Sequence, residues 1–108
     1  MAAWDARRVD DRLWARSGDG DVQVVAYHEG TVYVGGHFGP RFSGEVRNQL
    51  AAVDADDGDV LGYDPTFTGT NQPGMWAMVA DSDFLRVGGG FRGMTTGPQQ
   101  RYGEFPYR

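Results

Sequence analysis

Two stretches of this chain, 53 residues apart, have the same pattern with no gap between them. Residues 21–38 align with residues 74–91, and the motif Val-Gly-Gly-x-Phe occurs at Val34–Phe38 and again at Val87–Phe91. The apolar runs on either side of a short polar segment also coincide, although few other positions are identical. A repeat of this length indicates copies of one supersecondary unit that bury apolar surface against one another.

Each copy of the pattern predicts short β-strands rather than helices. The runs are about five residues long, are apolar, β-branched or aromatic, and are bounded by Gly, Asp or Pro. Apolar residues do not keep helical spacing for more than about two turns. We expect a loop between the second and third strands, where Gly, Pro and Arg are frequent. The strands expected in the first copy are Val22–Tyr27, Thr31–Val34, Gln49–Asp54 and Val60–Asp64.

The N-terminus fits the same scheme one unit earlier. Ala2–Ala6 is similar to Ala51–Ala55 and is expected to be a third strand, and Arg12–Ala15 is expected to be a fourth. We therefore expect residues 1–20 to be the last strands of one unit, 21–68 a complete unit, and 69–108 a following, partly degenerate unit.

Four antiparallel strands that recur about every 53 residues are typical of a β-propeller, in which each four-stranded sheet is one blade. Neighbouring blades cover both faces of a sheet, which explains why Val22–Ala26 is almost continuously apolar. A sandwich or small barrel would not require the repeated motif. Propellers close with about four to eight blades, and this chain offers roughly two. Either it is a piece of a longer protein, or several copies assemble.

The motifs of the first copy resemble the delta-60 type bacterial propeller repeat, a relative of the WD40, kelch and quinoprotein propellers. The second copy departs from that pattern at Gly103–Pro106. The resemblance implies a bacterial protein, extracellular or attached to the cell surface, that acts as a display or binding platform, and it supplies no specific functional residues. No signal peptide is expected in the first residues. The resemblance rests on residues 32–38, 44–54, 57–60 and 64–67.

Composition excludes several classes of function. The net charge of −5 and pI near 4.7 oppose general affinity for nucleic acid, which needs a basic surface. The absence of cysteine excludes disulfides and thiolate metal sites. No apolar run approaches the roughly 20 residues that a membrane-spanning helix needs.

Two motifs look like cofactor or metal sites, but we expect neither. Gly88-x-Gly90-x-x-Gly93 has the letters of the dinucleotide fingerprint, but no helix that would hold a pyrophosphate can follow it. Asp54–Asp59 resembles a calcium loop, but its glycine falls one position early and Pro65 replaces the bidentate glutamate. A hairpin turn explains the Asp and Gly residues.

The candidate ligand-binding residues are His37, Arg41 and the equivalent Arg92, because the segment after the second strand of a propeller blade often lines the rim of the axial funnel. His28 is placed in a hairpin turn, and neither histidine has a partner at metal-ligand spacing. For the three tryptophans, core packing is favoured over stacking on sugars. No serine lies in a nucleophile motif, and no catalytic residue is predicted.

The expected function is therefore non-catalytic binding or scaffolding, with a glycan or a protein as ligand and further blades as partners, and with no cofactor. Two alternatives remain open. The chain is part of a propeller enzyme, a quinone-dependent dehydrogenase or a hydrolase, whose active site other blades complete. Alternatively, copies of the chain close a ring as a lectin-like homo-oligomer.

Overall fold

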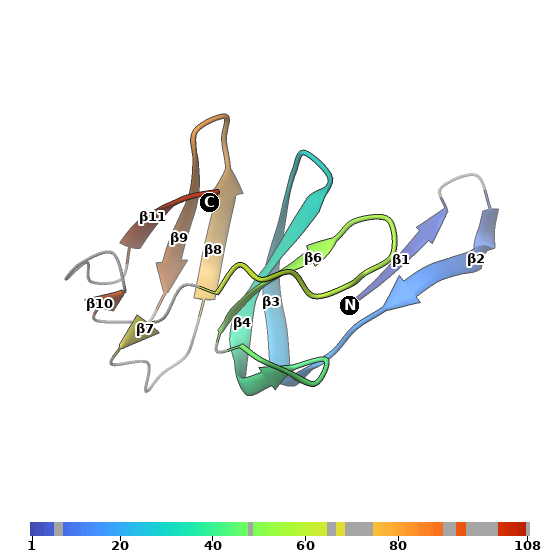
Figure 1. The fold of residues 1–108 in the computed structure, drawn as a ribbon, viewed down its shortest axis with the longest axis horizontal. Helices are drawn as coiled ribbons and strands as arrows, with labels where there is room; N and C mark the ends of the chain where they lie inside the picture. The colour runs from blue at the N-terminus through green and yellow to red at the C-terminus, as the bar shows by residue number, and fades with distance from the viewer. Residues whose placement is uncertain are drawn as a thin grey trace.

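The computed structural model describes residues 1–5, 8–47, 49–64, 67–68, 75–89, 93–94 and 102–107. This part of the chain is all-β, as predicted: curled antiparallel sheets form an open half-barrel, and the described residues contain no helix (Figure 1). The strands are β1 (Ala2–Asp5), β2 (Arg8–Ala15), β3 (Gly18–His28), β4 (Thr31–Phe42), β5 (Glu45–Val46), β6 (Leu50–Asp54), β7 (Phe67–Thr68), β8 (Met75–Ala80), β9 (Phe84–Gly89), β10 (Gly93–Met94) and β11 (Tyr102–Pro106).

Three sheets follow one another in chain order across the molecule (Figure 1). The N-terminal hairpin consists of β1 and β2. In the central sheet β4 pairs with β3 along one edge and with β5 and β6 along the other. The C-terminal sheet has the order β11-β9-β8, and β7 and β10 form a separate short pair. All of these pairings are antiparallel.

The central sheet is covered on both faces. Leu50 to Val53 in β6 are all fully buried, because successive side chains of a strand point to opposite faces and here enter two different cores. The face that carries Tyr33 packs against the C-terminal sheet, and the face that carries Val34 packs against the N-terminal hairpin. The buried residues of the first core are Tyr33, Leu50, Ala52, Met75, Leu85, Val87 and Phe105, and those of the second are Trp14, Val34, Phe38, Phe42, Ala51 and Val53.

The central and C-terminal sheets share one strand register. Each first strand carries a bulge at the same place, between Val22 and Val24 in β3 and between Met75 and Ala77 in β8. A bulge adds one residue to one strand and shifts the pairing beyond it, so its recurrence fixes the correspondence residue by residue. The matching pairs are Val24–Gly35 with Ala77–Gly88, Val25–Val34 with Met78–Val87, and Val34–Ala51 with Val87–Gly103.

The sheets also face in the same direction. Leu85 and Val87 of the C-terminal sheet occupy the positions of Val32 and Val34 in the central sheet. In both sheets these residues point to the sheet that precedes them in the chain. We call the two sides of the C-terminal sheet the Leu85 face, which is packed, and the Arg86 face, which points away from the central sheet.

Several predicted strand boundaries are wrong. The segment after Val34 was expected to be a loop, but β4 continues to Phe42, because β3 begins at Gly18 and pairs with β4 over this length. Phe38 and Phe42 lie in the core with ring centroids 5.1 Å apart, which holds this segment in place. The fourth strand expected at Val60–Asp64 is a single bridge between Val53 and Val60, followed by one hydrogen bond from the Leu61 N–H to the Ala52 carbonyl.

Candidate functional site

A shallow depression of about 350 Å³ lies at the end of the central sheet away from the β3–β4 turn. His37 from β4 lies on its wall, opposite Asp21 of β3. The side chains of His37, Asp19 and Asp21 are exposed, whereas Phe38 beneath them is buried. The lining residues are Asp19, Gly20, Asp21, His37, Phe38, Gly39 and Gln49.

The backbone around this depression is held by close contacts. Gly20 has φ +149°, and a Cβ added there would lie 2.0 Å from the His37 carbonyl oxygen, so only glycine allows β3 and β4 to approach in this way. Gln49 is 3% exposed and has a φ of +69°. Its N–H donates to the Phe38 carbonyl at 2.9 Å, and its carbonyl accepts from the Gly36 N–H at 3.1 Å. These contacts therefore fix the backbone around the depression.

The three predicted ligand-binding residues are not all brought together. His37 lines the depression, but Arg41 does not, because four residues of extended strand separate the two by about 13 Å. The Arg41 guanidinium instead donates to the Gly44 carbonyl at 2.9 Å and stays beside the β4–β5 turn. Arg92 lies outside the described residues. Of the three residues, His37 is therefore the one whose described surroundings support a role in ligand binding.

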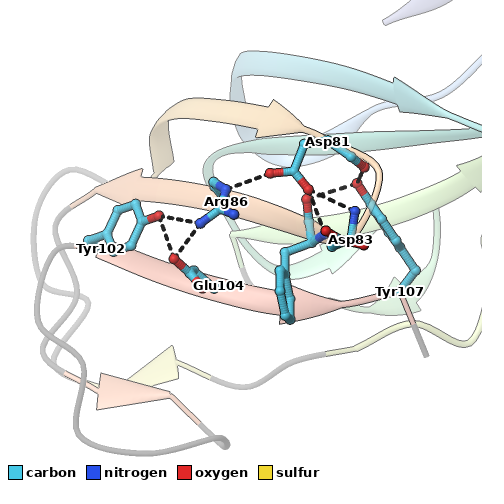
Figure 2. A network of polar contacts seen from close by, with 7 residues as sticks. Asp81, Asp83, Arg86, Tyr102, Glu104 and Tyr107 are labelled. Carbon is cyan, nitrogen blue, oxygen red and sulfur yellow. Dashed lines mark hydrogen bonds and ion pairs between the residues drawn. The ribbon is translucent and has the colours of Figure 1, made fainter.

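A second polar cluster lies on the Arg86 face of the C-terminal sheet (Figure 2). The Arg86 guanidinium donates from Nε to Asp81 Oδ2 at 2.6 Å, and its Nη1 contacts both Glu104 Oε1 and the Tyr102 hydroxyl. The Tyr102 hydroxyl in turn donates to Glu104 Oε1 at 2.9 Å. Glu104 is paired with Arg86 across β9 and β11, so the sheet register itself places opposite charges side by side.

The environment of Asp81 and Arg86 favours the charged form of each of these two groups. Hydrogen bonds from the Phe84 N–H, then from the Arg86 side chain and the Asp83 N–H, lower the pKa of Asp81 to about 2. The hydrogen bonds of the Arg86 side chain to Tyr102 and Asp81 raise the pKa of Arg86 above the ordinary value for an arginine. An arginine and carboxylates arranged in this way can bind a ligand or a partner.

An aromatic group joins the central and C-terminal sheets at one end. His28 was expected in the β3–β4 turn, but it ends β3 and stacks on Tyr107 with ring centroids 3.9 Å apart and planes 7° apart. The Tyr107 hydroxyl lies 2.6 Å from the Asp81 carbonyl oxygen and 2.9 Å from that of Phe84. The Tyr63 hydroxyl donates to the Pro106 carbonyl at 3.2 Å. These contacts connect the central and C-terminal sheets.

The Asp-rich segment of residues 54–59 is a turn, as expected. The Asp56 N–H donates to Asp54 Oδ1 at 2.8 Å, the Asp59 N–H donates to Asp57 Oδ1 at 2.9 Å, and Gly58 has a φ of +77°. The carboxylates therefore stabilise the turn itself. Within the described ranges, no group of three or more His, Asp or Glu residues is arranged to hold a metal ion.

The tryptophans divide between core and surface. Trp14 is 7% exposed and donates from Nε1 to the Ala55 carbonyl at 2.9 Å, which confirms the prediction of core packing for this residue. Trp76 is 57% exposed, so that prediction is wrong for Trp76. The side chain of Trp4 lies outside the described residues. In β8 only the residues that face the central sheet are covered, and Trp76 at the bulge is not among them.

The Arg86–Glu104 pair was missed by sequence reasoning, although a signal for it was present. In the alignment of the two copies, Arg86 falls opposite Tyr33 and Glu104 falls opposite Ala52. Charges of opposite sign at two positions that pair across strands predict an ion pair once the register is known. The departure at Gly103–Pro106 is thus compatible with a strand, because β11 forms there.

Comparison of the chain with protein-family models, with curated proteins and with solved structures finds no match. Among the described residues there is no helix of the length and apolar character required to cross a membrane.

Proposed function

We propose that this chain is a segment of a β-propeller and acts as a non-catalytic platform that binds a glycan or a protein ligand at the cell surface. The observation that carries the proposal is the shared register of the central and C-terminal sheets, including the bulge at Val22–Val24 and Met75–Ala77. Sheets with the same strand register that stack face to face in one direction are what successive propeller blades require.

The depression around His37 is the place where we propose that ligand binds. Asp19 and Asp21 supply carboxylates that accept hydrogen bonds, and the His37 imidazole supplies a donor. Sugar hydroxyls need both kinds of partner at close range, and the backbone hydrogen bonds of Gln49 to Gly36 and Phe38 fix the strand segment that carries His37. A monosaccharide unit is of the size that a shallow depression of about 350 Å³ accepts.

Support for a binding role rather than catalysis comes from the chemistry of the exposed groups. Around His37 there is an imidazole with two carboxylates on a neighbouring strand, but the described lining contains no serine or threonine nucleophile. In the Arg86 cluster the Asp81 carboxylate is held ionised by hydrogen bonds and by the guanidinium, so it is a poor general acid.

The test is a glycan array with the 108-residue chain, followed by calorimetric titration of each hit. His37→Ala and Asp21→Asn are expected to weaken binding at least tenfold, because the first removes the imidazole donor and the second replaces a charged acceptor oxygen by an amide N–H donor. Asp56→Asn, an exposed substitution in the turn at residues 54–59, is the matched control and is expected to leave affinity unchanged. Equal binding by all four proteins would refute the placement of the site, and turnover of a bound sugar would refute the non-catalytic role.

A further inference from the structure

The ionic groups that line the His37 depression are mainly carboxylates. Asp19 and Asp21 of β3 are both exposed there, and the strand register pairs Asp21 with His37 across β3 and β4. The His37 imidazole carries at most one positive charge, so the two carboxylates leave the lining with a net negative charge in either state of the imidazole. A ligand that enters the depression therefore meets a negative field.

The two carboxylates are open to a ligand. Asp19 and Asp21 take part in none of the ion pairs formed among the described residues. Those ion pairs use other carboxylates, which belong to Glu29, Asp59, Asp64, Asp81 and Glu104. The charges of the depression are therefore not cancelled by a described side chain, and a bound ligand can supply the opposite charge.

Arginine, the usual partner of an acidic sugar, is not among the described residues that line the depression. Guanidinium groups in the described structure are bound elsewhere, to backbone carbonyls or to carboxylates outside the depression. The net charge of the whole chain, −5, adds repulsion of an anion at longer range. A sugar that carries a carboxylate would thus find repulsion and no cationic partner of this kind. The guanidinium groups concerned are those of Arg16, Arg41, Arg47 and Arg86.

We infer that the depression selects its sugar by charge: it binds a sugar with an ammonium group more tightly than a neutral sugar, and it excludes a sugar with a carboxylate. The inference rests on the proposed function and names the class of glycan. An ammonium group donates three hydrogen bonds and accepts none, which suits two exposed carboxylates. A carboxylate on the sugar would face like charges, and such repulsion is how a binding site rejects the wrong ligand.

The test uses methyl glucosides that differ in one group. They are methyl glucoside, methyl glucuronide, and the methyl glucoside whose hydroxymethyl group is replaced by aminomethyl, together with the corresponding galactose series. Affinity is measured at neutral pH and low salt from the NMR shifts of the Asp21 and His37 backbone amides. An exposed ion pair changes an affinity by roughly two- to fivefold, and here two carboxylates act on a charge that is reversed.

We expect the aminomethyl probe to bind about tenfold or more tightly than the glucuronide, with the neutral glucoside between them. Added salt should reduce this ratio, because it screens exposed charges. Asp19→Asn removes one of the charges and keeps the size of the side chain, so it should reduce the ratio about threefold or more. Asp56→Asn removes the same charge from the turn at residues 54–59 and is the matched control, with no change in the ratio expected. Both positions are exposed, so the fold is expected to persist, and circular dichroism checks this.

Equal affinity for the aminomethyl and glucuronide probes, tighter binding of the glucuronide, or no response to any probe would overturn the inference. An equal loss of the ratio in Asp19→Asn and Asp56→Asn would also do so, because selection would then come from the net charge of the chain. Failure of the proposed function has a different outcome: no glycan on the array binds in a way that depends on His37. A glycan rich in uronic acid whose binding does depend on His37 would overturn this inference and leave the binding function standing.

Discussion

Replacing Gly58 by alanine tests how the N-terminal hairpin is attached to the central sheet. Gly58 lies in the turn after β6 with φ +77°, and a Cβ added there would lie 2.6 Å from Trp14 Cδ2. Gly30 in the β3–β4 turn has a similar φ of +82°, but a Cβ there would meet no atom within 4 Å. The two substitutions impose the same backbone strain and differ in whether they displace Trp14.

The expected cost of each substitution follows from these contacts. A left-handed backbone costs an alanine about 1–2 kcal/mol, and both variants incur this. Gly58→Ala must also displace the Trp14 ring, whose hydrogen bond to the Ala55 carbonyl contributes about 1 kcal/mol. Removing a buried tryptophan altogether costs about 3–5 kcal/mol, which sets the upper limit. We expect Gly58→Ala to lower the free energy of unfolding by about 2–4 kcal/mol more than Gly30→Ala does.

The assay is equilibrium unfolding in urea, followed by circular dichroism and by tryptophan emission, which should shift to the red if Trp14 becomes exposed. A double-mutant cycle isolates the contact: in a Trp14→Ala background, Gly58→Ala should cost no more than Gly30→Ala. Equal destabilisation by the two glycine substitutions in the unsubstituted chain would refute the reasoning, because Trp14 would then not be the residue that the Cβ displaces.

Two further predictions concern the contact between the central and C-terminal sheets and the acid stability of the latter. Gly35→Ala should lower the free energy of unfolding in urea by about 1–3 kcal/mol, because the new Cβ would lie 2.8 Å from Met75 Cβ, whereas the control Gly62→Ala meets nothing within 4 Å and should be neutral. The folded-state pKa of Asp81, about 2, is below its ordinary value, so its stabilising contribution is present above pH 4 and lost as the pH falls towards 2. Asp81→Asn should therefore reduce the change in melting temperature between pH 4 and pH 2. Thermal melts in which the melting temperature of the variant depends on pH as steeply as that of the unsubstituted chain would contradict this.

The sequence was sufficient for the fold class and for much of the strand order, because these depend on local pattern. The Asp and Gly residues at 54–59 predicted the turn that the structure has there. The apolar run before them predicted a strand at Gln49–Asp54, where the structure has β6 at Leu50–Asp54. The gapless alignment of the two copies also gave the correct correspondence between β4 and β9, since their pairings match at every aligned position.

What the sequence could not give depends on contacts between distant segments. The loop predicted after Val34 contains Gly39 and Pro40, which oppose a strand locally, but pairing with the start of β3 overrides this preference. Arg41 was grouped with His37 as if both lined one loop, and the extended strand separates them. Trp76 was assigned to the core by its strand, but no other sheet covers that part of β8 in the described structure.

The polarity of the Arg86 face comes from a pair of opposite charges and not from a single ion. At the positions where the central sheet has Tyr33 and Ala52, the C-terminal sheet has Arg86 and Glu104, and both were placed there by the register. Had only one of these residues been charged, covering the face would leave an unpaired ion and would cost several kcal/mol. Because the charges are paired across β9 and β11, neither ion depends on water alone for a partner.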